Sequence, residues 1–267
     1  MSDFQIVNLT PENFADYGVC GYKDVTKHKE LRAKLEWFTT YYPKGLRIKV
    51  VVSPTGGYQG MIEYIPGEYA HRPVVAPGFM FIHCIFVGFK KEYKGKGLAS
   101  MLIGECENDA KALDMNGVSV VTRKGSFMAG SELFTKHGFK PVEQARPDFE
   151  LLVKKLTRND VYPSFNKEVL SGSDQYDDGL TIFRSPQCPY TEKNVNSILD
   201  TAQKKYKLKT RLIDLKDHEA AQRTPNPFGS FALVYNGKVI SHHPISNTRF
   251  ENIMDSVLNG SQGKQIK

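Results

Sequence analysis

The sequence predicts a mixed α/β fold in two parts: a mixed sheet with flanking helices, followed by a smaller α/β domain. Two observations carry this prediction. Apolar β-type runs alternate with segments of helical periodicity along the chain. A polar stretch rich in Ser, Asp and Gly then interrupts the alternation at residues 157–178. We therefore expect a linker there, between domains at 1–156 and 179–267.

The first elements are a short strand and two helices. Residues 5–9 form the strand, and Thr10-Pro11-Glu12 is a helix-opening signal with Thr as N-cap. A second helix is expected at 26–42, where apolar residues make a stripe, and Pro43-Lys44-Gly45 ends it. Two alternating strands then follow, joined by a hairpin-type connection, at 46–52 and 58–64.

The most informative segment is a buried strand at 79–87 that leads through a lysine-glycine loop into a helix at 98–113. Small residues at Gly95, Gly97 and Ala99 let backbone N–H groups approach phosphate oxygens, and the helix N-terminus adds its positive dipole end. Neither the Walker spacing nor the Rossmann fingerprint occurs here. We expect a basic cradle for a pyrophosphate, the alternative being an ordinary solvated turn.

This loop resembles the acetyl-CoA loop of the GNAT N-acetyltransferases. The family pattern is Arg or Gln, two residues, Gly, one residue, then Gly or Ala; the chain has Lys94-Gly95-Lys96-Gly97-Leu98-Ala99. Lysine in the first place keeps the charge and loses the planar fork of arginine. The resemblance extends over residues 4–156, with a strand at 117–122 and a CoA-contacting helix at 131–139. It implies acetyl-CoA as co-substrate.

The resemblance also assigns residues to the cofactor and the acceptor. Phe134 stands where the family often has a tyrosine that protonates the CoA thiolate. Either another group or water protonates the thiolate, or the thiolate leaves without a proton donor. The acceptor pocket would lie beside the first two helices, with Tyr22, Trp37 and Tyr64 as candidates, although each is an ordinary core residue by type. The cofactor residues implied are Ile85, Phe86 and Val87 through their backbone, Lys94, Gly95, Lys96, Gly97, Leu98, Ala99, Ser100 and Phe134.

Direct acetyl transfer requires that the attacking amine lose a proton. Glu63 and His83, on neighbouring strands, are the candidate bases. Strand alternation places His83 on one face with Phe81 and Ile85, where a satisfied core histidine is equally expected. Alternation puts Cys84 on the other face with Ile82 and Phe86, and we interpret this thiol as core packing rather than as a nucleophile.

The second domain has the order strand, cysteine turn, helix, strand and hairpin, which resembles the thioredoxin-like fold. Its elements are expected at 180–184, 192–206, 210–215 and 231–240. Cys188-Pro-Tyr-Thr191 resembles a glutaredoxin motif with Thr191 in the place of the resolving cysteine. A cysteine before a helix N-terminus tends toward a lowered pKa, so Cys188 is a candidate monothiol. The whole arrangement resembles the bacterial YoaP-like proteins.

Composition limits the alternatives. The chain of 267 residues is 40% apolar and carries a net charge of +7 with a pI near 9.0. Its basic residues are spread widely without a nucleic-acid-reading motif, so we expect no nucleic-acid partner. No apolar run approaches the ~20 residues that span a bilayer, and the N-terminus has no export signal, so we expect a cytoplasmic protein without a membrane partner. The four cysteines form no metal-ligand pattern, so we expect free thiols and no metal.

The sequence therefore predicts an acetyl-CoA-dependent N-acetyltransferase that moves an acetyl group to the amine of a small molecule or peptide by direct attack. One alternative is a monothiol redox or thiol-sensing protein that acts through Cys188 and uses the first domain to bind CoA. A further alternative is a non-catalytic interaction module.

Overall fold

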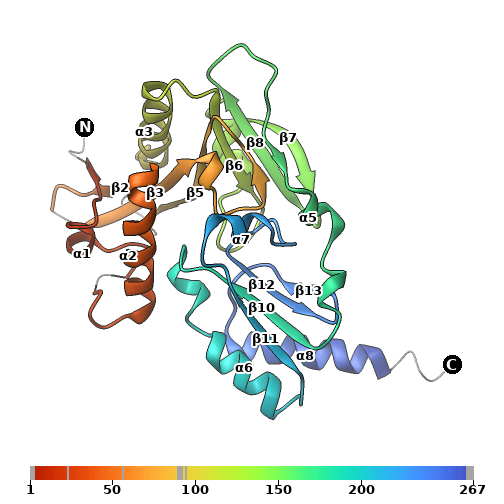
Figure 1. The fold of residues 1–267 in the computed structure, drawn as a ribbon. Coiled ribbons are helices and arrows are strands. Elements are labelled where there is room, and N and C mark those ends of the chain that lie inside the picture. Colours follow the sequence, from red (N-terminus) through yellow and green to blue (C-terminus); the bar gives the residue numbers. More distant parts are fainter. Residues whose placement is uncertain (1–3, 23, 56, 89–92, 94, 263–267) are drawn as a thin grey trace.

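The structure, a computed structural model, describes residues 4–22, 24–55, 57–88, 93 and 95–262. Within this part the strands form a seven-stranded sheet, a four-stranded sheet and a two-stranded ribbon. Figure 1 shows the four-stranded sheet below the larger sheet, with helices α6 and α8 at its far side. The predicted mixed α/β class is confirmed.

The larger sheet has the strand order β1-β2-β3-β5-β6-β8-β7. Its neighbours are antiparallel except for β5 and β6, which run parallel. The connection between these two is helix α3, as parallel neighbours require. The strands are β1 (Gln5–Asn8), β2 (Arg47–Val52), β3 (Tyr58–Pro66), β5 (Phe79–Val87), β6 (Gly117–Thr122), β7 (Lys140–Ala145) and β8 (Phe149–Lys155).

The helices of this part cover both faces of the larger sheet. Helix α3 packs on one face, where Ile62 and Leu102 share a buried cluster, and α2 packs on the other, where Phe38 and Met61 do so. The helices are α1 (Phe14–Tyr17), α2 (Lys29–Tyr41), α3 (Leu98–Ala112) and α4 (Ser131–Thr135).

The predicted start of the first helix at Thr10 is wrong. Thr10 instead belongs to a turn in which its backbone N–H donates to Asn13 Oδ1 at 2.7 Å, and the Asn13 N–H donates to the Thr10 hydroxyl at 3.4 Å. These reciprocal bonds satisfy the turn's own backbone groups, so α1 begins only at Phe14.

The smaller sheet has the order β11-β10-β12-β13, with β10 and β11 parallel and the other pairs antiparallel. This is the thioredoxin-like arrangement that the sequence predicted. Two helices, α7 and α8, were not predicted from the sequence. The elements are β10 (Leu180–Arg184), α6 (Val195–Lys204), β11 (Thr210–Asp214), α7 (His218–Gln222), β12 (Phe231–Tyr235), β13 (Lys238–Ser241) and α8 (Asn247–Gln262).

The two larger sheets share one apolar core. Phe81 and Phe149 of the seven-stranded sheet lie in the same buried cluster as Phe231 and Phe250 of the C-terminal part. The segment 157–178 between them also holds regular structure. It contains β9 (Ser164–Phe165), which pairs with β4 (Val74–Val75), helix α5 (Lys167–Ser171) and a 3₁₀ turn at Asp174–Tyr176. Shared burial of this kind fixes how the two parts meet.

In the described part of the chain, no helix combines the length and the apolar character that crossing a membrane requires.

Close contact between β3 and β5 generates a stability prediction. A Cβ at Gly60 would lie 2.5 Å from the carbonyl oxygen of Phe86, whereas a Cβ at Gly104, inside α3, meets nothing within 4 Å. Gly60→Ala should therefore lower the free energy of unfolding by about 1–3 kcal/mol. Gly104→Ala, the matched control, should raise it by roughly 0.5–1 kcal/mol. Urea unfolding measures both, and a Gly60→Ala protein as stable as the wild type would contradict the strand contact.

Candidate active site

The two parallel strands of the larger sheet separate part-way along their length. Pairing of β5 with β6 runs from Phe79 opposite Gly117 to Ile82 opposite Val120. Strand β5 continues to Val87, paired on its other side with β3. Beyond Ile82, no described strand pairs with the β6-facing edge of β5. This edge of β5 is therefore where a ligand can meet the backbone of the strand.

A β-bulge lies where the strands begin to part. Glu63 of β3 pairs with Cys84, but the next residue, Tyr64, pairs with Ile82, so His83 is the extra residue. A bulge breaks strict alternation of side chains. The predicted faces therefore fail across the bulge: Ile85 packs with Ile82 on the α3 side, while Cys84 packs on the α2 side, with Phe86 as predicted but without Ile82.

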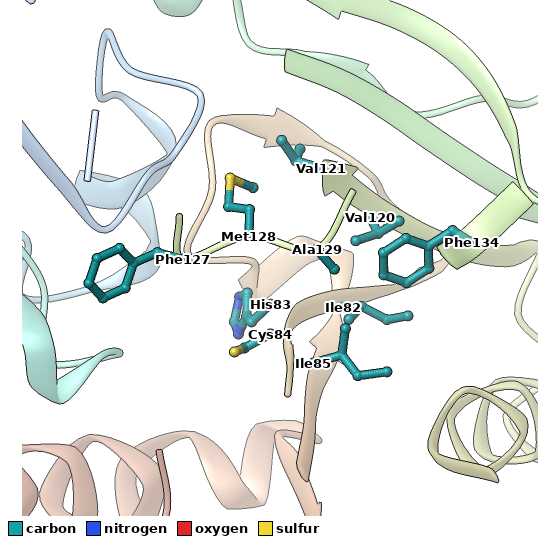
Figure 2. Close-up of a pocket in the computed structure, with 10 residues that line it drawn as sticks. All are labelled: Ile82, His83, Cys84, Ile85, Val120, Val121, Phe127, Met128, Ala129 and Phe134. Carbon is teal, nitrogen blue, oxygen red and sulfur yellow. The ribbon is translucent and has the colours of Figure 1, made fainter. Parts of the chain in front are cut away.

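A pocket occupies the gap between the separated strands. It is lined by β5 residues including His83 and Cys84, by β6, by the loop after β6, and by Phe134 of α4. Figure 2 shows Phe127 pointing away from the other lining side chains. Phe127 contacts Tyr190 and His243 instead, with ring centroids 5.7 Å and 5.4 Å apart. The C-terminal part of the chain thus borders the mouth of the pocket.

The predicted anion cradle leads into α3. Gly95 and Gly97 have φ angles of +72° and +75°, and a Cβ at either would meet nothing within 4 Å. No side chain caps the helix at Gly97, and its first turn holds no acidic residue. The amide groups that open α3, beginning at Leu98 and Ala99, are thus free of a side-chain cap, as an anion requires. Lys96 is exposed, and Lys94 lies outside the described residues.

Two other predicted cofactor residues lie next to this cradle. The Ser100 hydroxyl is 3.1 Å from Nε2 of His137, which ties α3 to the end of α4. Phe134 is 1% exposed, packs edge-on against Phe139 and lines the pocket. Its phenyl ring has no proton to give to a departing thiolate.

Glu63 and His83 lie side by side in the buried interior beneath the pocket. The Glu63 carboxylate pairs with the ammonium group of Lys34 from α2. Its other oxygen, Oε1, lies 3.1 Å from His83 Nδ1. Burial would raise the pKa of Glu63, but the charge of Lys34 and the hydrogen bond from His83 lower it to about 2. The carboxylate is therefore ionised at neutral pH.

The hydrogen bonds of His83 define its tautomer. The backbone N–H of His71 donates to Nε2 at 2.8 Å, so Nδ1 carries the proton that faces Glu63. Burial lowers the pKa of His83 to about 4, although Glu63 opposes the shift. His83, a residue of the pocket lining, thus carries a neutral imidazole that is itself buried against the Glu63 carboxylate.

Residues that the sequence did not predict complete this polar cluster. Gln187, in the loop after β10, donates from Nε2 to Glu63 Oε1 at 2.7 Å, and its backbone carbonyl accepts from Lys34. Arg72 donates to the carbonyl of His83 at 3.0 Å. Lys34 had a detectable signal, since it interrupts the apolar stripe of α2 between Leu31 and Phe38. Gln187 had none.

The three predicted acceptor-pocket residues do not lie together. Trp37 donates from its indole N–H to His71 at 2.9 Å and lies 6.0 Å from the His83 ring, between centroids. Tyr22 packs 5.4 Å from Tyr190, and burial raises its pKa to about 12. Tyr64 belongs to the α3-side cluster, where its hydroxyl donates to Asp109. It therefore faces away from the α2 side of the sheet.

The cysteines lack the properties of reactive thiols. Burial raises the pKa of Cys188, so the expected lowering is wrong. Helix α6 begins only at Val195, too far along the chain for its dipole to act on this thiol. Burial also raises the pKa of Cys84, to about 12. Among the described residues, no group of three or more His, Cys, Asp or Glu side chains is arranged to hold a metal ion.

Comparison with known proteins extends over both parts of the chain. It is 28% identical over 263 residues to an uncharacterised N-acetyltransferase, YoaP, of Bacillus subtilis (strain 168), covering 94% of this chain and 98% of that protein. A family model described as YoaP-like matches residues 210–252. The predicted resemblance is confirmed. The chain therefore resembles an acetyltransferase-type enzyme with a YoaP-like C-terminal segment.

Solved structures resemble somewhat more than half of the chain. A GNAT-family acetyltransferase of Staphylococcus aureus is 13% identical, covers 58% of this chain and 99% of its own, and gives a TM-score of 0.42. A spermidine N-acetyltransferase of Vibrio cholerae, solved with CoA and spermine, is 14% identical. It covers 57% of this chain and 95% of its own, with a TM-score of 0.40.

The shifted pKa values predict how stability depends on pH. The folded protein keeps His83 neutral down to about pH 4, whereas the unfolded chain protonates it near its usual 6.5. Unfolding therefore takes up a proton in this window, and stability present above pH 6.5 is lost as the pH falls toward 4. One such group contributes a slope of up to about 1.4 kcal/mol per pH unit. Urea unfolding at several pH values should show a shallower slope for His83→Gln, and an unchanged slope would contradict the assignment.

Proposed function

We propose that this protein transfers the acetyl group of acetyl-CoA to a primary amine in the gap between β5 and β6. The observation that carries the proposal is the separation of these strands at the His83 bulge, next to a glycine cradle at the start of α3. The β6-facing edge of β5 beyond Ile82, which runs past Ile85, Phe86 and Val87, is where the backbone would meet the pantetheine arm. The cradle offers amide groups to the pyrophosphate. Similarity to an N-acetyltransferase over 94% of the chain supports this function.

The amine attacks the thioester carbonyl, so a C–N bond forms and the C–S bond breaks as the CoA thiolate leaves. The amine proton goes to the Glu63–His83 pair. His83 faces the pocket and Glu63 lies behind it, so the carboxylate stabilises the imidazolium that forms. Nε2 of His83 can accept this proton only when the backbone N–H of His71 no longer donates its hydrogen bond to Nε2. Water protonates the thiolate, because Phe134 has no donor.

The thiol-based alternative loses its physical basis in the surroundings of Cys188. A reactive thiol needs a lowered pKa, and here burial raises it. Thr191, in the position of the missing partner cysteine, donates its hydroxyl to the carbonyls of Ser185 and Cys188. This turn is therefore held by hydrogen bonds and contains no second cysteine.

Binding of acetyl-CoA is tested by a thermal shift with two glycine variants. At about 100 times its Kd, acetyl-CoA should stabilise the wild type by roughly 2.7 kcal/mol. Gly97→Ala places a methyl group in front of the cradle amides and should abolish most of this shift. Gly172→Ala is a control for a strained substitution outside the cradle, since Gly172 also has a positive φ, of +86°, with nothing within 4 Å of a Cβ. A wild type without any shift would contradict the CoA site.

The proton acceptor is tested by Glu63→Gln and His83→Gln. Each should lower the rate of acetylation by about 10²-fold or more, because general base catalysis contributes at least that much. The acetyl-CoA thermal shift should persist, since neither residue is in the cradle. A panel of aminoglycosides, polyamines, amino acids and peptides, followed by CoA release, identifies the acceptor. Unchanged rates in both variants would rule out the pair as the base.

A further inference from the structure

The C-terminal part of the chain contributes a side chain to the centre of the proposed site. Gln187 is 3% exposed and lies in the loop between β10 and α6, which carries the glutaredoxin-like Cys188-Pro-Tyr-Thr191 turn. Its amide nitrogen donates to Glu63 Oε1 at 2.7 Å. The same oxygen faces His83 Nδ1. Gln187 is thus the second neighbour that orients the carboxylate toward the imidazole.

Gln187 also holds the opposite side of the bulge. Its side-chain oxygen accepts from Arg72 at 3.3 Å, and Arg72 in turn donates to the carbonyls of His71 at 2.8 Å and His83 at 3.0 Å. The bulge is therefore fixed from two directions. One runs through the carboxylate of Glu63 and the other through the backbone of His83.

The backbone of Gln187 adds a third contact, because its carbonyl accepts from the ammonium group of Lys34. Lys34 needs this partner as well as Glu63, since a buried ammonium group is stable only when its donors are satisfied. Thr191 keeps the loop in the shape that presents Gln187, by donating to the carbonyl of Ser185 at 2.6 Å. In the thioredoxin-like fold, the corresponding loop carries redox thiols. In this protein the loop instead supplies the side-chain amide of Gln187 to the proposed acetyltransferase site.

We propose that Gln187 is a positioning residue for acetyl transfer, through which the C-terminal part holds Glu63, Arg72 and the His83 bulge in their working geometry. This inference rests on the proposed function. It makes the C-terminal part a component of the enzyme's own site. It predicts that the loop acts on the proton-transfer step and not on acetyl-CoA binding.

The test compares Gln187→Ala, Gln187→Glu and a control, Gln222→Ala. Gln222 also bridges the two parts, donating to the carbonyls of Glu68 at 3.0 Å and Ala70 at 3.2 Å, but it does not touch the Glu63 cluster. CoA formation from acetyl-CoA is followed with the best amine of the panel, or with water as acceptor where no amine reacts. Gln187→Ala should lower kcat by about 10- to 100-fold with the KM for acetyl-CoA unchanged, since small displacements of a catalytic group cost this much. Gln222→Ala should leave kcat unchanged.

Gln187→Glu keeps the shape of the side chain and adds a carboxylate beside Glu63, which favours protonation of the pair. The acid limb of the pH–rate profile should move upward by about one pH unit or more. Fluorescence of Trp37, the single tryptophan of the chain, gives a second measure of titration in this cluster, because its ring lies 5.0 Å from His71, to which it donates, and 6.0 Å from His83. The pH midpoint of its quenching should move in the same direction, and it can be followed in a variant that is inactive.

The outcomes separate this inference from the function beneath it. A wild type that forms no CoA from acetyl-CoA overturns the proposed function, and the role of Gln187 with it. An active wild type whose Gln187 variants match Gln222→Ala in kcat, acid limb and Trp37 midpoint overturns the role of Gln187 alone. Loss of kcat with a shifted acid limb in Gln187→Glu, at unchanged KM, supports it.

Discussion

The buried carboxylate of Glu63 is the constraint on which the centre of this protein depends. An ionised carboxylate removed from water is costly unless charges and hydrogen bonds replace its solvation. Here those partners come from three distant places in the chain: Lys34 on α2, His83 on β5, and Gln187 in the C-terminal part. Removing any one would take a partner from this buried carboxylate. The two sheets must therefore dock in one arrangement, which their shared apolar core also favours.

The same constraint explains the shape of the gap. The bulge at His83 turns the imidazole toward Glu63 and sends the following residues to new faces, so Ile85 and Cys84 exchange the sides that regular alternation would give them. From the bulge onward, β5 no longer pairs with β6. One extra residue in a strand thus both places the imidazole and opens the pocket in which we place the acetyl transfer.

Most elements could be predicted from the sequence, because local patterns determine them. The strands at Phe79–Val87, Gly117–Thr122 and Leu180–Arg184 were predicted to the residue. The bulge could not be predicted, since the sequence around His83 fits an unbroken period of two. The misplacement of Tyr64 has another cause: β3 alternates regularly, with Ile62 and Tyr64 on the α3 side, so Tyr64 lies against Asp109 rather than beside Trp37.

The candidate site was predictable only in part. The glycine cradle is a local motif, and Glu63 and His83 are ionisable residues in apolar strands, so both left signals in the sequence. Gln187 left none, because it reaches Glu63 across 124 residues and its amide has no local pattern to mark it. The predicted lowering of the Cys188 pKa is wrong for a related reason. The motif is local, but burial by the surrounding tertiary structure determines the pKa of the thiol.

A crystal structure with bound acetyl-CoA tests the central claim most directly. We predict the pyrophosphate at the start of α3 and the thioester carbonyl in the gap between β5 and β6, next to His83. Gln187 should be hydrogen-bonded to Glu63 in the same crystal. Acetyl-CoA bound elsewhere on the protein, or a Glu63 carboxylate that faces solvent without Gln187, would contradict the account.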